Sequence, residues 1–139
     1  MKESTSTPYN IKEKQEKNAA YRSLIRAELA DELYDKILHI VIIEKRYRNK
    51  DFSAKELAVE LGTNTRYISA VINSRFGTNF SCLLNEYRIQ IAKRMILNER
   101  EMTLEEIGYA VGYHDYHCFL KQFKRFASVT PSAYRREIH

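Results

Sequence analysis

Three polar side chains stand at helical spacing just after Gly62-Thr63-Asn64: Arg66, Ser69 and Asn73. Residues three and four apart share one face of an α-helix, so these side chains would form a continuous polar strip. Arginine can donate two parallel hydrogen bonds to guanine, asparagine pairs in the same way with adenine, and serine bonds to a base or a phosphate. The strip is therefore a candidate for contacting base edges. The alternative is the solvated face of an ordinary surface helix.

A two-helix motif between Phe52 and Phe76 would position this strip. Ser53 and Glu56 have the spacing of a capping box, which satisfies free amides where a helix begins. Gly62 ends that first helix, because glycine accepts the left-handed backbone of a sharp exit. Ala58 is small enough for a second helix to cross closely. The apolar face of the second helix comprises Ile68, Val71, Ile72 and Phe76. This combination predicts a helix-turn-helix.

The same pattern recurs fifty residues later. The residues Glu56, Leu57, Ala58, Leu61 and Gly62 have counterparts in Glu106, Ile107, Gly108, Val111 and Gly112. Thr103 and Glu106 repeat the capping-box spacing. The second turn is one residue longer, so Ile68 and Ile72 correspond to Phe119 and Phe123 at an offset of fifty-one. Two copies in one chain predict two helix-turn-helix subdomains.

Composition favours an all-α chain without a disulfide scaffold. The 139 residues include only 4 Gly and 2 Pro, with neither between Tyr9 and Leu61, and 44% are hydrophobic. The 23 basic and 18 acidic residues give a net charge of +5, which permits a nucleic-acid partner. Cys82 and Cys118 are too few and too far apart for a disulfide framework. The absence of a signal core and of a long apolar run predicts a soluble cytoplasmic protein without a membrane span.

The sequence gives little support for a metal site or for enzymatic activity. His114, Asp115, His117 and Cys118 lie close together, but adjacent residues on a helix point apart and a tetrahedral zinc site needs better spacing. Nucleophile elbows, phosphate-cradling glycine loops and zinc-protease motifs are absent from the sequence. We therefore expect no metal, no cofactor and no enzymatic activity.

The chain divides into four predicted segments. Residues 1–32 form an N-terminal extension, disordered to about Asn10 and then helical over 11–30, with Tyr21, Leu24, Ile25 and Leu29 as a thin apolar stripe. Residues 33–80 form the first subdomain, beginning with a helix over 33–47. Residues 81–98 form a long linker helix that Ser81 can cap, and 99–139 form the second subdomain. The extension is either a solvated helix lying on the domain or a helix that binds a partner or a second copy.

The stretch GYHDYHCFLKQFKRFASVTPSAYRR resembles the C-terminal signature of the AraC/XylS family of bacterial transcription regulators. The resemblance covers about residues 33–136 and implies two helix-turn-helix subdomains joined by a long helix. Two positions depart from the family pattern. Ser128 stands where the family usually has glycine, so that turn is expected to be strained or differently shaped. Leu120 occupies an often polar position of the second recognition helix, where it could touch a thymine methyl instead.

With this resemblance, candidate contacts can be assigned to both motifs. The second recognition helix is expected from about Asp115 to Phe126, burying Phe119, Phe123 and Phe126. The predicted base contacts are Arg66, Ser69, Asn73, Tyr116, His117, Leu120 and Lys121. The predicted phosphate contacts are Arg75, Lys124 and Arg125, with the helix starts at Ser81 and Ser132. Arg135 is either a further phosphate contact or a structural clasp. The basic run Lys45, Arg46, Arg48 and Lys50 is either a solvated helix end or the source of one phosphate contact.

The expected function is sequence-specific binding of double-stranded DNA to regulate transcription, with activation as the outcome implied by the family. RNA polymerase and a second copy of the chain, bound through the N-terminal helix, are further candidate partners. Two other classes of function remain open. One is a nonspecific architectural DNA binder, and the other is a protein-interaction module that uses the leading helix.

Overall fold

The computed structural model describes residues 8–137, and every regular element in this range is helical, which confirms the all-α class. The elements are α1 (Pro8–Leu38), the π-helix η2 (His39–Ile43), the 3₁₀ helix η3 (Arg46–Arg48), α2 (Ala54–Glu60), α3 (Thr65–Phe76), α4 (Phe80–Asn98), α5 (Leu104–Ala110), α6 (Tyr116–Ala127) and α7 (Pro131–Glu137). The pair α2–α3 and the pair α5–α6 are the two predicted helix-turn-helix motifs. Their starts are offset by fifty and then fifty-one residues, as the repeat predicts.

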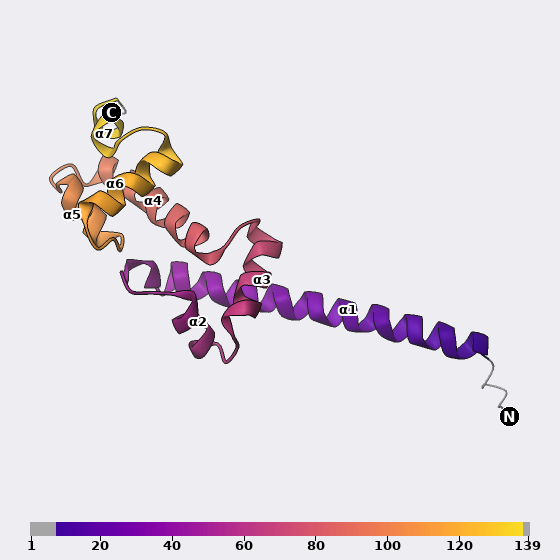
Figure 1. The fold of residues 1–139 in the computed structure, drawn as a ribbon. Coiled ribbons are helices and arrows are strands. Elements are labelled where there is room, and N and C mark those ends of the chain that lie inside the picture. Colours follow the sequence, from indigo (N-terminus) through magenta and orange to yellow (C-terminus); the bar gives the residue numbers. More distant parts are fainter. Residues whose placement is uncertain (1–7, 138–139) are drawn as a thin grey trace.

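Helix α4 connects the two subdomains (Figure 1). The end of α1 and the pair α2–α3 lie toward the start of α4, whereas α5, α6 and α7 surround its other end. Nineteen residues at about 1.5 Å each give α4 a length of about 28 Å. The fold therefore holds α3 and α6 at fixed positions on either side of one rod.

Helix α1 is a single rod rather than the two helices expected over 11–30 and 33–47. It contains 31 residues and runs through the predicted segment boundary at residue 32 without a break. No glycine or proline between Ala30 and Leu33 supplies a stop. The chain leaves helical geometry only after Ile43, and Lys45 adopts a φ of 57°. The disorder expected up to Asn10 falls mainly outside the described residues, and Pro8 to Asn10 are helical.

Only the last turns of α1 are packed into the body. Leu33 and Ile37 are buried, whereas Leu24 and Leu29 are 57% and 52% exposed. Figure 1 shows the earlier turns of α1 extending away from the other helices. The predicted apolar stripe is thus exposed at these two leucines.

The helix caps follow local sequence with three exceptions. Thr103 and Glu106 form the complete capping box, with bonds of 3.0 and 2.8 Å. In the first motif the Ser53 hydroxyl accepts from the Glu56 amide at 3.3 Å, but the Glu56 carboxylate lies against Arg46 at 3.5 Å instead of closing the box.

The other two exceptions correct the predicted caps of α4 and α7. Asn79 caps α4 by accepting from the Cys82 amide at 2.8 Å, so Ser81 lies inside the first turn. Thr130 caps α7, because its hydroxyl accepts a hydrogen bond from the Ala133 amide at 3.1 Å. Ser132 therefore lies within that helix. In both cases the capping side chain stands two residues earlier than expected.

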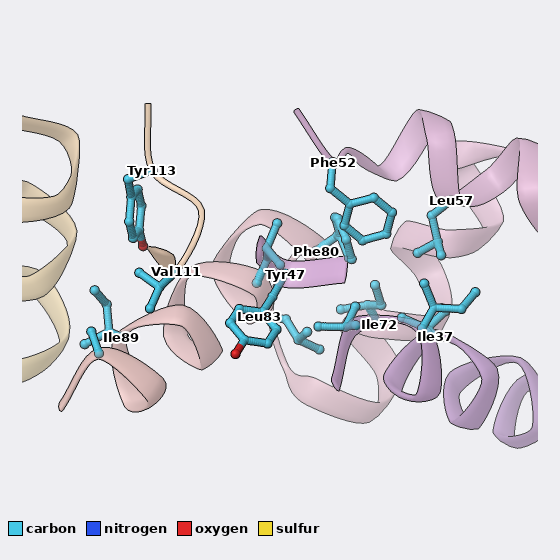
Figure 2. Packing of buried hydrophobic residues seen from close by; sticks show 14 of the residues in the cluster. Ile37, Tyr47, Phe52, Leu57, Ile72, Phe80, Leu83, Ile89, Val111 and Tyr113 are labelled. Atoms are coloured by element: carbon cyan, nitrogen blue, oxygen red, sulfur yellow. The ribbon is translucent and has the colours of Figure 1, made fainter. Parts of the chain in front are cut away.

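One continuous apolar core runs through both subdomains. Figure 2 shows Ile37, Leu57 and Ile72 on one side, and Ile89, Val111 and Tyr113 on the other. Both subdomains pack on α4, so its buried positions surround much of the helix: Phe80, Leu83, Leu84, Arg88, Ile89, Ala92 and Ile96. This set replaces much of the single predicted stripe, of which Tyr87, Ile91 and Met95 are only half-buried.

Candidate nucleic-acid interface

The three polar residues of α3 lie on one exposed face, here named the α3 strip: Arg66, Ser69 and Asn73. Asn64 begins the helix by accepting from the Tyr67 amide at 2.8 Å, so Arg66 stands in the first turn. The opposite face is anchored by Ile68, Val71 and Ile72, which are buried. Burial of this face fixes the rotation of α3 and directs the strip to solvent.

Helix α6 presents a second strip, here named the α6 strip: Tyr116, His117, Leu120 and Lys121. His117 and Lys121 are exposed, while Tyr116 and Leu120 are half-buried. The Tyr116 ring lies 6.0 Å from that of Phe119, so part of its surface belongs to the core. His117, Leu120, Lys121 and Lys124 line one shallow surface hollow of about 310 Å³. Three of these four side chains carry nitrogen donors, which suits an anionic ligand with hydrogen-bond acceptors.

Asp115 fixes the start of α6. Its carboxylate accepts from the Cys118 amide at 2.8 Å, and this backbone hydrogen bond lowers the pKa of the Asp115 carboxyl. Phe119 and Phe123 are fully buried behind it, and Phe126 is half-buried rather than buried as predicted. At the other end of α6, Ser128 adopts a φ of 67°. Serine thus holds the left-handed turn in which the family usually places glycine.

The candidate phosphate contacts differ in the exposure of their side chains and in the partners that these side chains already have. Lys124 and Arg125 are exposed, and the Arg125 guanidinium lies 5.1 Å from the centre of the Phe126 ring. Ser81 and Ser132 are exposed in the first turns of α4 and α7. Arg75 instead donates from Nε to Asp31 at 2.5 Å and from Nη2 to the Ala27 carbonyl at 3.2 Å. Its guanidinium therefore holds α1 against α3 in this structure.

Two further arginines have structural partners. Arg135 donates to the carbonyl oxygens of Met102 at 2.9 Å and Glu99 at 3.2 Å. Of its two predicted roles, this structure therefore shows the structural clasp. Arg46 pairs with Glu44, Glu56 and Glu60 at 3.1 to 3.5 Å. The hydrogen bond to Glu60 is the main cause that raises the pKa of Arg46. Within the basic run Lys45, Arg46, Arg48 and Lys50, Arg46 is thus engaged by carboxylates.

Arg88 joins the two subdomains, a role that no sequence motif predicted. Arg88 is buried to 6% exposure, and its Nε donates to the Tyr47 carbonyl at 2.8 Å and its Nη2 to the Asn49 carbonyl at 3.0 Å. Its guanidinium also lies 5.3 Å from the centre of the Tyr113 ring in the second subdomain. Burial lowers the pKa of Arg88. The available signal was its position four residues from both Leu84 and Ala92, on a buried face of α4.

Tyr113 completes this contact from the other side. Its hydroxyl donates to Asn85 Oδ1 of α4 at 2.7 Å, and burial raises its pKa well above the usual tyrosine value. We name Tyr47, Asn85, Arg88, Gly112 and Tyr113 the subdomain joint. The joint fixes how the second motif sits on α4, and therefore where the α6 strip lies relative to the α3 strip.

His114, one of the four crowded residues considered as metal ligands, contacts the first subdomain. His114 Nε2 lies 3.3 Å from Asp51 Oδ1 of that subdomain. Within residues 8–137, no group of three or more histidine, cysteine or acidic side chains is arranged to hold a metal ion. A search of the same described residues finds no helix with the length and apolar character needed to cross a bilayer.

Comparison with known proteins agrees with this architecture. A family model described as a helix-turn-helix domain matches residues 57–137. The chain is 35% identical over 95 residues to the transcriptional activator RhrA of Rhizobium meliloti, an alignment covering 68% of this chain and 30% of that protein. It is 29% identical over 103 residues to the HTH-type transcriptional regulator YtdP of Bacillus subtilis, covering 74% of this chain and 13% of YtdP. The chain thus spans less than a third of these relatives.

Solved structures show the same fold. The C-terminal domain of AraT, a response regulator from Geobacillus stearothermophilus, matches with a TM-score of 0.65 at 32% identity. The match covers 68% of this chain and 78% of the AraT chain. The C-terminal domain of the two-component response regulator yesN from Fusobacterium nucleatum matches with a TM-score of 0.65 at 31% identity. The match covers 73% of this chain and 98% of the yesN chain. The chain belongs to the AraC-type helix-turn-helix family of DNA-binding transcription regulators.

Proposed function

We propose that this chain binds double-stranded DNA at specific sequences and regulates transcription by placing α3 and α6 in two successive major grooves. The observation that carries the proposal is the pair of exposed strips, one at each end of α4, on a single continuous core. A recognition helix normally enters the major groove with its N-terminal residues against the base edges. Arg66 and His117 stand in the first turns of their helices, which suits this docking.

The proposed contacts fall into two groups. The base contacts are Arg66, Ser69, Asn73, Tyr116, His117, Leu120 and Lys121. The phosphate contacts are Lys124, Arg125, Ser81 and Ser132, which lie on exposed surface at helix ends or beside the strips. Arg75 becomes available to a phosphate only if it leaves Asp31. Because phosphate contacts carry little sequence information, specificity is assigned to the first group.

The distance between the two strips constrains the shape of the bound DNA. Major-groove faces on one side of B-DNA repeat about every 34 Å, or 10–10.5 base pairs. The α4 rod, at about 28 Å, is somewhat shorter. The duplex must therefore bend toward the protein, or one motif must dock less deeply. Because the two strips differ in sequence, the site is asymmetric and one chain occupies it.

We further propose that regulation takes the form of activation, with RNA polymerase as a partner. The relative RhrA is named a transcriptional activator, which supports this direction. A DNA partner also implies that the chain acts in the cytoplasm of a bacterium.

The exposed Leu24 and Leu29 on α1 favour a second role for that helix as a contact for another protein or a second copy.

The decisive experiment selects bound fragments from random DNA and then counts chains per duplex by titration. We expect one asymmetric site per chain. Inserting five base pairs between its two halves turns one groove to the far side of the duplex, so affinity should fall to that of one motif. Enrichment of no sequence, with binding only at low salt, would identify a nonspecific binder. A palindromic site that holds two chains and tolerates the insertion would contradict the two-groove geometry.

A further inference from the structure

Each recognition helix carries an apolar side chain close to its proposed base contacts that is not among the described core residues. In α3 the side chain of Tyr67 is exposed as well. In α6 the apolar residues that pack in or against the core are Tyr116, Phe119, Phe123, Phe126 and Ala127. Leu120 is not among these described core residues, and it lines the hollow beside His117 and Lys121. In α3 the core residues are Ile68, Val71, Ile72 and Phe76, whereas Ala70 is exposed. Core packing therefore does not account for an apolar side chain at Leu120 or Ala70, although alanine also favours the helix at position 70.

Leu120 belongs to the α6 strip, and Ala70 lies beside the residues of the α3 strip. Ala70 is four residues after Arg66 and three before Asn73, so it stands between the ends of the α3 strip. Leu120 is three residues after His117 and four before Lys124, which is the spacing that Ser69 has between Arg66 and Asn73. The offset of fifty-one pairs Ala70 with Lys121 and Ser69 with Leu120. The two helices therefore place an apolar group at neighbouring, but not identical, positions.

Among the base edges in the major groove, only thymine presents an apolar group, its C5-methyl. We propose that Ala70 and Leu120 each contact the methyl group of one thymine, so that each half of the DNA site contains a thymine recognised by its methyl. This inference rests on the proposed function and names what two further side chains recognise. The donors of Arg66, His117 and Lys121 suit hydrogen-bond acceptors on guanine or adenine, whereas Leu120 and Ala70 suit the methyl.

The test replaces single thymines of the selected site with deoxyuridine, which removes the methyl and keeps the hydrogen-bonding edge. Burial of one methyl-sized group corresponds to about a fourfold change in affinity, from about 0.8 kcal/mol per buried group. We expect a loss of about fourfold at one thymine in each half-site. Leu120→Ala should abolish the effect in the α6 half-site only, and Ala70→Gly in the α3 half-site only.

Matched variants separate recognition from stability. Val59→Ala removes an apolar side chain of α2 that is 76% exposed, and Ala20→Gly adds a glycine to α1 at an exposed position. Neither should change the response to deoxyuridine. Ala70→Ser keeps the helix and makes the contact polar, so it should lower the thymine preference if Ala70→Gly unfolds the motif.

Two results would separate this inference from the proposed function. If wild-type protein binds every deoxyuridine probe as tightly as the thymine site, while Arg66→Ala still changes base preference, the methyl contacts are absent and the function stands. If no sequence is enriched from random DNA, the proposed function fails and the methyl contacts fail with it. Loss of a protein partner instead of DNA affinity in Leu120→Ala would assign the hollow to a protein interface.

Discussion

The buried Arg88 of α4 donates from Nε to the backbone carbonyl of Tyr47 at 2.8 Å, which ties the linker helix to the first subdomain. Gly112 of the second motif lies against this same bond. A Cβ at Gly112 would collide with the Tyr47 carbonyl oxygen and stand 2.9 Å from Arg88 Nε. One hydrogen bond and one missing side chain thus bring both subdomains and the linker together at a single point.

The first prediction compares the two equivalent glycines. Gly62 and Gly112 both have positive φ, but a Cβ at Gly62 would meet nothing within 4 Å. Gly62→Ala should cost about 1–2 kcal/mol of stability for the left-handed backbone alone. Gly112→Ala should cost about 1–3 kcal/mol more because it overpacks the joint. Chemical denaturation of both variants measures the difference, and equal losses would mean that the joint can yield.

The second prediction concerns the crossing of α2 and α3. Ala58 is buried in that crossing, so Ala58→Leu should destabilise the fold by about 1–3 kcal/mol and weaken DNA binding with it. Its neighbour Val59 is 76% exposed, which makes Val59→Leu the control that adds bulk outside the contact. Thermal melting compares the two. An unchanged melting temperature in Ala58→Leu would show that the crossing lies elsewhere.

The third prediction separates base contacts from phosphate contacts. Arg66→Ala should cost about 1–3 kcal/mol and relax the preference at one base position. Lys124→Ala should weaken binding to all sequences alike and reduce the salt slope by about one unit. The measurement is competition against shuffled DNA at several salt concentrations. Uniform losses in both variants would remove Arg66 from the base contacts.

The fourth prediction is a dependence on pH. The Cys118 amide lowers the pKa of the Asp115 carboxyl below its usual 3.8. The ionised cap therefore stabilises α6 fully above that usual value, and this contribution is lost as the pH falls through the lower pKa of the folded state. Asp115→Asn keeps an accepting oxygen that does not titrate. The difference in stability between wild type and Asp115→Asn should narrow as the pH falls below 3.8, and a constant difference would contradict this role.

The fifth prediction is a stabilising change at the end of α6. Ser128 has a φ of 67°, a conformation that costs a side-chain-bearing residue about 1–2 kcal/mol relative to the right-handed region. Glycine relieves this cost but loses more backbone entropy on folding, by about 0.5–1 kcal/mol. Ser128→Gly should therefore raise stability by up to about 1.5 kcal/mol in denaturant titrations. A loss of stability would show that the serine has a compensating contact.

Several features of this protein could be predicted from neighbouring residues alone. Helix ends depend on short-range chemistry, so Gly62, Gly112 and the Thr103–Glu106 pair marked them correctly. The rotation of α3 and α6 follows from apolar spacing, which placed Ile68 and Phe119 inside. The internal repeat determined the two-motif architecture, because similar local patterns form similar supersecondary structure. The strips were exposed for the same reason, since their positions lie opposite the apolar faces.

Long-range packing decided the rest. Arg75 was predicted to contact phosphate from its place on α3, but Asp31 lies forty-four residues away in sequence and takes up its guanidinium. Arg88 gave only the signal of a charge on an apolar face. Its carbonyl partners are Tyr47 in η3 and Asn49 at the end of η3, which no local pattern brings to α4. Helix propensity could not show that α1 continues past residue 32 or where it meets α3. Such contacts depend on how separate elements pack, so only the tertiary structure fixed the distance and angle between the α3 strip and the α6 strip.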